Sequence, residues 1–540
     1  MKKKVLIFLT KNKLLLIILA LYSALLISVI DFGIPNPSHP FPYHMDEWHQ
    51  LMAVRSLFKT GSSNVLGAAN GPLFFFFLSG IFLGPFYLFK IIDPFVIKSS
   101  IGSLEEQKHL FEVLRLTSLF FGIGAITLVW LIAKKYLKVN PLVTTLFFTF
   151  TPLFIMLSNY FKYDIALLFW ILLSVYCLLR FLAKPSQKGY FMSAIFIGCA
   201  LATKISALPL VPVYFITYVL SHFKKKKRFR TIVYGLGIII ITFIHVGMPD
   251  IFFRAKQYYD FFYLNIVLGP EESTHFILHE GMWLFLYTHV YPLTFGHAFY
   301  GLFGFSFSYF IFGLLYKKEK VQKETIVVFL MVVFFIFSML SLKIQAIGNR
   351  ILVLLPFMAF FVGILYEKLM KIKNPLIKKT IVCVFIFAFF IQVLEVFSWL
   401  QIKIGANPRK DASRWIQHTL SRQTIGLENI PIYQSIPDLL LKEFYMTQQD
   451  PKTPTRFTYQ IIDEKASALP KTIIITNADF DTQFFKDSAK KRLLKRLTKE
   501  GYTEIKRFNP SWNLYKYFGS TTDMAFLSLV PLMPISVYQK

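Results

Sequence analysis

Long apolar runs recur along most of this chain of 540 residues, and they constrain its fold more than any other feature. Each run holds about 17 to 25 residues, the length that a helix needs to cross about 30 Å of hydrocarbon. Hydrophobic residues make up 55% of the sequence, more apolar surface than a soluble fold could bury. The sequence therefore predicts an α-helical protein that crosses the membrane many times.

The charge of the chain is strongly positive, with a net value of +29. The lysines and arginines fall in short runs between the apolar segments. That is the pattern of cytoplasmic loops in membrane proteins, whereas a nucleic-acid-binding domain gathers its basic residues on one face. We therefore predict no nucleic-acid partner.

The same charges predict an orientation in the plasma membrane. Lysines before the first apolar run place the amino terminus in the cytoplasm. The apolar stretch 71–92 is ambiguous, because it either crosses the membrane or lies at its outer interface. The second choice puts the basic residues of 134–138, 224–230 and 317–323 inside, as the charge rule requires. This assignment predicts about eleven transmembrane helices.

The tail of the chain has a different composition. Because the predicted number of spans is odd and the amino terminus is placed in the cytoplasm, the tail lies outside the cytoplasm. Its segment 472–476 reads as a short strand, and 486–500 reads as a charged helix. We predict a transmembrane domain over 1–404, whose first outer loop covers about 31–110, and a small extracytoplasmic α/β domain over 405–540.

An acidic pair, Asp46 and Glu47, follows the first apolar run. Apolar residues such as Trp48 and Leu51 then recur at helical spacing until a glycine stop. This pattern predicts an amphipathic helix on the membrane surface with Asp46 at its amino end. Helix capping alone could explain Asp46, but it does not explain Glu47 beside it. We interpret the pair as part of an active site.

Other candidate groups fall at the outer ends of apolar runs. Asp164 begins one run, where it either faces Asp46 across a cleft or only stabilises the start of a helix. Lys204 interrupts another run, so it either reaches for the interface or meets an anion such as a lipid phosphate. Arg350 precedes a third, and its guanidinium can bind phosphate with two hydrogen bonds.

A loop between about 250 and 297 is rich in titratable residues, including His275 and Glu280. Its spacing does not match a zinc signature, so we assign no metal ligand and no cofactor, while a divalent metal stays open. We interpret the loop as a solvated lid that could help to seat an acceptor.

Together these segments resemble the GT-C superfamily of membrane glycosyltransferases, and within it the protein O-mannosyltransferase and lipid A aminoarabinose transferase branch. The resemblance lies in five short motifs: Asp46-Glu47, Gly71-Pro72-Leu73, Tyr163-Asp164, Thr203-Lys204 and Asn349-Arg350. The sequence departs from the family pattern at Gly71, where a histidine is usual, and at Ile351, where a tyrosine is usual.

The resemblance implies transfer of a sugar from a polyprenyl-phosphate carrier to a protein, lipid or glycan acceptor outside the cytoplasm, with inversion of the anomeric centre. It assigns roles to Asp46 as general base with support from Glu47, and to Lys204 and Arg350 as ligands of the donor phosphate. From the residues themselves, we interpret Asp164 as a second catalytic carboxylate, and Tyr163, His275 and Glu280 as candidate substrate-loop residues. The alternative is a transporter or flippase of lipid-linked sugars, which would place ionisable groups near the middle of the membrane on broken helices.

Overall fold

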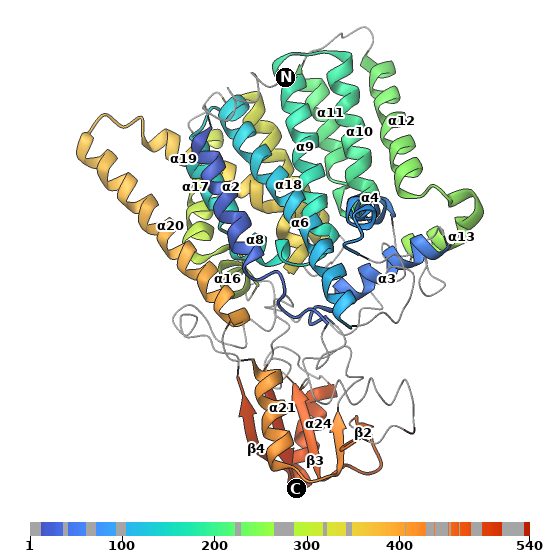
Figure 1. The fold of residues 1–540 in the computed structure, drawn as a ribbon. Helices are drawn as coiled ribbons and strands as arrows, with labels where there is room; N and C mark the ends of the chain where they lie inside the picture. Colours follow the sequence, from blue (N-terminus) through green and yellow to red (C-terminus); the bar gives the residue numbers. More distant parts are fainter. Residues whose placement is uncertain are drawn as a thin grey trace.

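The computed structural model describes most of the chain. The described residues are 12–35, 42–60, 72–92, 104–221, 228–263, 286–316, 321–341, 348–404, 407–427, 437, 452, 455–463, 465–476, 489–509 and 534–540. His275 and Glu280 lie outside these ranges. In Figure 1 the described part consists of a helical bundle with a smaller α/β domain below it.

Apolar helices build the bundle, which confirms the helical membrane fold. The helices are α2 (Lys13–Ile27), α3 (Met45–Thr60), α4 (Phe74–Leu88), α6 (Leu104–Ile132), α7 (Pro141–Thr149), α8 (Pro152–Ser158), α9 (Tyr163–Ala183), α10 (Gln187–Thr203), α11 (Leu210–Ser221), α12 (Arg228–Gly247), α13 (Ile251–Phe262), α16 (Tyr291–Phe295), α17 (His297–Leu315), α18 (Lys323–Ser341), α19 (Leu355–Leu369) and α20 (Pro375–Ile404). Short π and 3-10 segments join some of them: η1 (Ala133–Leu137), η2 (Ile205–Ala207), η6 (Leu286–Val290) and η7 (Gly348–Leu354).

The number of helices that could cross a membrane is lower than the sequence predicts. Among the described residues, six helices are long and apolar enough, or seven if α7 and α8, which meet at a bend of 61°, form one span. The difference from about eleven arises because several apolar runs fold into shorter helices. Examples are α2, with 15 residues, and α10, with 17.

The ambiguous stretch 71–92 forms α4, a helix of 15 residues. Such a helix extends about 22 Å, less than the hydrocarbon thickness. Figure 1 views α4 nearly end-on, whereas α6, α9 and α10 run from top to bottom. Because α4 lies across the direction of these long helices, its orientation favours the interfacial placement over a span.

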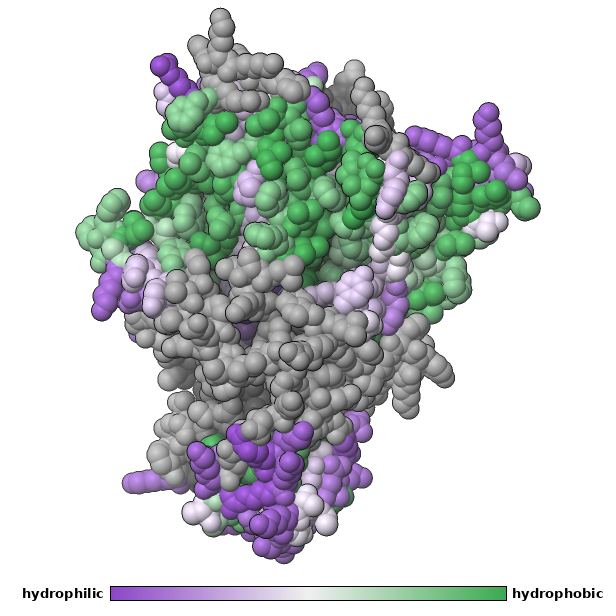
Figure 2. Space-filling model, turned by 180° about the vertical axis from the view of Figure 1, so that it is seen from behind, coloured by the Kyte–Doolittle hydropathy of each residue, from purple (hydrophilic) through white to green (hydrophobic). Residues whose placement is uncertain are grey.

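The outside of the bundle is apolar. Large hydrophobic side chains such as Phe229 and Ile241 on α12, and Ile386 and Phe387 on α20, are exposed. Figure 2 shows the corresponding apolar belt around the helical part, above a more polar small domain. A surface of this kind is stable against lipid rather than water, so the protein is an integral membrane protein.

Two segments that the charge rule predicts to be cytoplasmic lie together at one end of the bundle. The Lys134 ammonium donates to Oδ1 of Asn12 at 2.9 Å, and the Trp130 indole donates to the same oxygen at 3.0 Å. In Figure 1 the chain starts at the top of the bundle, and the α/β domain lies at its lower end. The relative positions agree with the prediction, whereas the side of the membrane that each end faces stays a prediction.

The small domain is α/β, as the sequence predicts. Its elements are α21 (Pro408–Thr419), β1 (Thr424–Leu427), β2 (Thr458–Ile461), β3 (Thr472–Thr476), α24 (Ala489–Lys499), β4 (Thr503–Phe508) and β5 (Ile535–Gln539). The described strands form one sheet in the order β2-β1-β3-β5-β4. β1 runs parallel to β2 and β3, whereas β5 is antiparallel to β3 and β4. The predicted strand and charged helix correspond to β3 and α24.

Alternating side chains of β3 bury both faces of the sheet. Ile474 belongs to the cluster formed with Ile416 of α21, whereas Ile473 belongs to the cluster formed with Leu493 of α24. Because successive side chains of a strand point to opposite faces, each face is covered by one helix. Trp48 of α3 packs against the α21 cluster, so the start of α3 touches the small domain.

Candidate active site

The candidate site begins at the amino end of α3, whose bounds match the predicted amphipathic helix. Leu51 and Val54 of this helix are buried, and the acidic pair occupies its first turn. The two acids have different environments, because the Asp46 side chain is 52% exposed and the Glu47 side chain is 0% exposed. Neighbouring residues of the same type therefore serve different purposes.

Glu47 forms a buried ion pair with Arg115 of α6. The guanidinium Nε and Nη2 donate to the two carboxylate oxygens at 2.9 and 2.6 Å, and the backbone N–H of Phe161 donates to Oε1 at 2.8 Å. Arg115 Nη1 also donates to the carbonyl oxygens of Ile30 and Phe32, at 2.5 and 2.8 Å. We call Glu47 and Arg115 the sealed pair. It ties α3 to α6, to the segment before α9 and to the start of the first outer loop.

Asp46 pairs instead with Lys162, the residue before α9. The Lys162 Nζ lies 2.6 Å from Oδ2 of Asp46 and 3.8 Å from Oδ2 of Asp164. Burial alone would raise the pKa of Asp46, but the charge of Lys162 outweighs this effect and holds the pKa of Asp46 well below its usual range. Asp46 is therefore ionised at neutral pH. We call Asp46 and Lys162 the open pair.

His44 supports the backbone of Asp46. Its Nδ1 accepts a hydrogen bond from the Asp46 N–H at 3.3 Å. Burial, with a contribution from the positive charge of Lys162, lowers the pKa of His44 to about 4. The imidazole is therefore neutral at physiological pH, which lets Nδ1 act as an acceptor.

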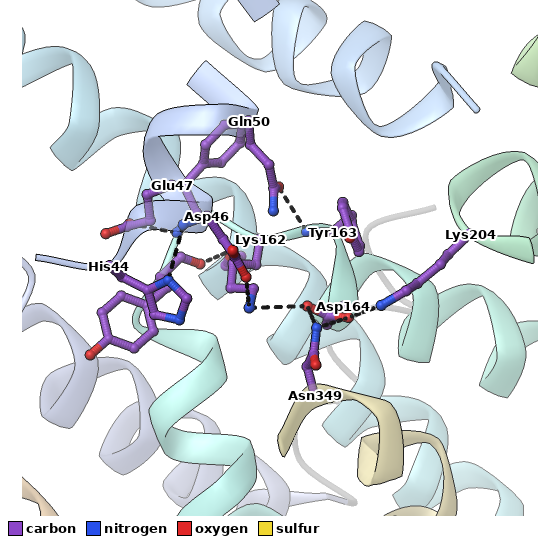
Figure 3. Close-up of polar contacts among 12 residues, drawn as sticks. His44, Asp46, Glu47, Gln50, Lys162, Tyr163, Asp164, Lys204 and Asn349 are labelled. Atoms are coloured by element: carbon purple, nitrogen blue, oxygen red, sulfur yellow. Dashed lines mark hydrogen bonds and ion pairs between the residues drawn. The ribbon is translucent and has the colours of Figure 1, made fainter. Parts of the chain in front are cut away.

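Asp164 collects partners from two other segments. Its Oδ1 accepts from the Lys204 ammonium at 2.8 Å, and both oxygens accept from Nδ2 of Asn349 at 3.1 and 3.3 Å. Figure 3 shows Asp46 and Asp164 on either side of Lys162, with Lys204 and Asn349 beyond. No side-chain cap stabilises the start of α9. These bonds between segments favour a role across the site over helix capping.

Lys204 and Arg350, the predicted ligands of the donor phosphate, both lie near Tyr163 and Asp164. α10 ends at Thr203, and the Lys204 ammonium lies 4.7 Å from the centre of the Tyr163 ring. Burial alone would lower the pKa of Lys204, but the Asp164 carboxylate has the opposite effect, and the pKa of Lys204 is raised overall. The ammonium therefore stays charged. Arg350, on η7, is exposed and interacts electrostatically with Tyr163 and Asp164. With Lys162, three cations face two carboxylates, which leaves an excess of positive charge.

The sequence reasoning missed Lys162 and Arg115. Lys162 stood in a segment interpreted as a connection between helices. Arg115 belongs to a run of charged residues at the start of α6, and its partner Glu47 is 68 positions away. The available signal for Arg115 was its place at the edge of an apolar run, where an unpaired charge is costly.

Among the described residues, no group of three or more histidine, cysteine, aspartate or glutamate side chains could hold a metal ion. His275 and Glu280 are not among these residues. The question of a divalent metal therefore stays open.

Comparisons with known proteins agree with the resemblance. Residues 107–248 match the family model described as dolichyl-phosphate-mannose-protein mannosyltransferase. The matched segment runs from α6 to the end of α12 and includes Arg115, Lys162, Asp164 and Lys204. This match confirms, over that segment, the resemblance to GT-C membrane glycosyltransferases that the sequence predicts.

Solved structures similar to this chain include two membrane enzymes. ArnT from Cupriavidus metallidurans, bound to undecaprenyl phosphate, is 11% identical with a TM-score of 0.45, over 97% of this chain and 98% of that chain. The Archaeoglobus fulgidus oligosaccharyltransferase, tethered with an acceptor peptide, is 12% identical with a TM-score of 0.47, over 76% of this chain and 58% of that chain. This chain thus covers somewhat more than half of the archaeal protein. No curated protein matches this chain.

Proposed function

We propose that this protein transfers a sugar from a polyprenyl-phosphate carrier to an acceptor hydroxyl or amine at the outer face of the membrane, with inversion of the anomeric centre. The observation that supports this most strongly is the row of ion pairs from Asp46 through Lys162 and Asp164 to Lys204. It joins an exposed carboxylate to cations at the end of an apolar bundle. A base and a cationic site for a departing phosphate are the two parts that such a transfer needs.

The cations Lys204 and Arg350 bind the donor phosphate in this proposal. The bond between the anomeric carbon and the phosphate oxygen breaks, and its electrons leave with the phosphate. Positive charge placed beside that oxygen stabilises the growing negative charge. A phosphate competes with Asp164 for Lys204, so donor binding rearranges an ion pair that already exists. The polyprenyl tail stays in the hydrocarbon layer against the apolar bundle.

Asp46 is the general base. An acceptor hydroxyl or amine attacks the anomeric carbon from the side opposite the phosphate and transfers its proton to the Asp46 carboxylate. Lys162 supports this role by keeping the carboxylate ionised, and the 52% exposure of the Asp46 side chain leaves room for an acceptor. Glu47 is a positioning residue, because Arg115 and the Phe161 N–H occupy its oxygens.

The arrangement of the charges supports an enzyme over a flippase of lipid-linked sugars. The described site residues stand at helix ends: Asp46 in the first turn of α3, Asp164 in the first turn of α9 and Lys204 after the last turn of α10. The α/β domain touches α3 at this end of the bundle. The charge rule assigns the opposite end, where Lys134 meets Asn12, to the cytoplasm. The site therefore faces outward in this proposal.

The test uses the full-length protein in lipid nanodiscs with radiolabelled polyprenyl-phosphate mannose and a panel of other polyprenyl-phosphate sugars. A membrane extract supplies acceptors. We expect release of polyprenyl phosphate and transfer of label by the wild type, and neither by Asp46→Asn. Asp463→Asn, at an exposed acid in the α/β domain, is the matched control and should behave as the wild type.

A liposome assay separates the alternative. If the wild type moves the labelled carrier across the bilayer without releasing polyprenyl phosphate from any donor in the panel, the protein is a flippase and the proposed transfer is wrong. Full transfer by Asp46→Asn would overturn the assignment of the base.

A further inference from the structure

The first outer loop closes on itself just before Asp46. The rings of Phe32 and Tyr43 meet edge to face at 5.6 Å, and the Tyr43 N–H donates to the carbonyl oxygen of Gly33 at 2.8 Å. Gly33 has a φ of +64°, and a Cβ at this position would lie 2.7 Å from the Tyr43 ring. Because only glycine fits there without strain, the loop holds Tyr43 at a fixed place three residues before Asp46.

Three residues around the linker to the α/β domain contact these two rings. The Lys403 ammonium lies 5.3 Å from the centre of the Phe32 ring. Asn407 Nδ2 donates to the Tyr43 hydroxyl at 3.1 Å, and the Arg409 guanidinium lies 4.3 Å from the centre of the Tyr43 ring. We call these five residues the linker clamp.

Asn407 serves both sides of the clamp at once. Its Oδ1 caps α21 by accepting from the N–H groups of Arg409 and Lys410, at 3.0 and 3.4 Å, while its Nδ2 bonds to Tyr43. Arg409 is buried, with 3% of its surface exposed. Asn407 therefore joins the start of α21 to the loop, and the buried Arg409 guanidinium, which stacks on Tyr43, reinforces this contact.

The clamp residues are connected to the open pair by short stretches of chain and by hydrogen bonds. Tyr43 precedes His44, whose Nδ1 accepts from the Asp46 N–H. The carbonyl of Phe32 accepts from Arg115 of the sealed pair. On the other side of Asp46, Trp48 packs against the core of the α/β domain. The small domain and its linker thus hold the chain within three residues of Asp46 on both sides.

A cavity of about 410 Å³ lies beside the clamp, and Tyr43, Lys403 and Asn407 form part of its wall together with Asp31 and Lys410. Among the described residues, no side chain fills this space, so their packing does not replace the clamp contacts on this side of the loop. Losing a clamp contact would therefore let the loop shift.

We infer that the α/β domain positions the proposed base through the linker clamp. Tyr43, Asn407 and Arg409 are positioning residues: they fix the start of α3 so that the Asp46 carboxylate meets the acceptor. This inference rests on the proposed role of Asp46. A reacting group displaced by about 1 Å can lose up to a hundredfold in rate, so a loosened clamp lowers turnover without removing a catalytic residue.

The test compares variants of the full-length protein in nanodiscs. Arg409→Ala removes the stacked cation, Arg409→Lys keeps a cation, and Asn407→Ser keeps a helix cap but is too short to reach the Tyr43 hydroxyl. Arg414→Ala is the control, because Arg414 lies on the same helix with a side chain that is 75% exposed. We expect Arg409→Ala and Asn407→Ser to lower kcat about tenfold with donor KM within about twofold of wild type. Arg409→Lys should recover most of kcat.

Hydrogen exchange gives a readout that does not need turnover. We expect faster exchange at the amides of residues 43–60 in Arg409→Ala, with unchanged exchange in β3 and with no change in Arg414→Ala. Exchange and kcat equal to those of Arg414→Ala would overturn the inference. So would an equal rise across β3, which would mean that the substitution only unfolds the small domain.

The two proposals fail separately. If the wild type transfers no sugar, the proposed function is wrong, whereas faster exchange confined to 43–60 still supports the clamp. If Arg409→Ala does not fold, Asn407→Ser decides the question, because the serine hydroxyl still caps α21.

Discussion

The sealed pair and the open pair each contain one of two adjacent acids, but the two carboxylates differ in burial and in the number of their hydrogen-bond partners. Glu47 is fully buried, and three hydrogen bonds from two segments satisfy its carboxylate. Asp46 is half-exposed and has one close cation, which it shares with Asp164. A carboxylate that is completely satisfied holds a structure together. A carboxylate that keeps a face toward solvent can accept a proton, which is why we propose Asp46 rather than Glu47 as the base.

The largest expected effect is on the open pair. Asp46→Asn should lower transfer by about 10²- to 10⁴-fold, the range that general-base catalysis contributes. The loss in the free energy of unfolding should be smaller than the about 3–5 kcal/mol expected when a buried pair loses one partner, because Asp46 is half-exposed and Lys162 keeps Asp164 as a second carboxylate. Initial rates and thermal unfolding in detergent measure the two quantities. A large loss of stability with normal turnover would reverse the roles of the two pairs.

The sealed pair should respond in the opposite way. Arg115→Met leaves the Glu47 carboxylate buried without its cation, so we expect a loss of about 3–5 kcal/mol in the free energy of unfolding. The double variant Arg115→Met with Glu47→Gln should recover much of this loss, since the uncompensated charge is gone. Unfolding measurements on Arg115→Met, Glu47→Gln and the double variant form a thermodynamic cycle. If Arg115→Met is as stable as the wild type, the ion pair between Glu47 and Arg115 does not hold the fold together.

A substitution at Lys204 tests the cations that we propose to bind the donor phosphate. Lys204→Gln removes one charged hydrogen-bond donor, so we expect donor KM to rise about tenfold, and Lys204→Arg should retain more of the affinity. Titration with polyprenyl phosphate alone measures the same interaction without turnover. Unchanged binding in Lys204→Gln would assign Lys204 a structural role beside Asp164.

The smallest effect is a pH dependence that arises at His44. Its pKa in the folded protein is about 4, below the ordinary value of 6.5. The unfolded chain therefore binds a proton at His44 before the folded protein does. The stability that depends on this residue is fully present above about pH 6.5 and is lost as the pH falls toward 4. The wild type should lose more thermal stability over this interval than His44→Gln, and equal losses would contradict the pKa of His44.

Periodicity and local chain signals predicted the elements that carry the site, but not the pairings between them. The helix after Asp46, the break at Lys204 and the strand at Thr472–Thr476 depend on neighbouring residues, which a sequence displays directly. The separation of Asp46 from Glu47 depends on Arg115 and Lys162, which approach only after α6 and α9 have packed. The number of membrane spans also depends on packing: six or seven of the described helices are long and apolar enough to cross a membrane, because apolar runs such as Lys13–Ile27 form shorter helices.

The position of Lys162 between two carboxylates has a consequence for the order of events. Its ammonium lies 2.6 Å from Oδ2 of Asp46, which makes that carboxylate a weak acceptor of protons. If a phosphate binds beside Lys204 and Arg350 as proposed, its negative charge competes with Asp46 for Lys162, and Asp46 would become more basic. Lys162 would thus set the order of binding: an acceptor or water molecule that arrives before the donor meets a weakly basic Asp46, so premature reaction is slow.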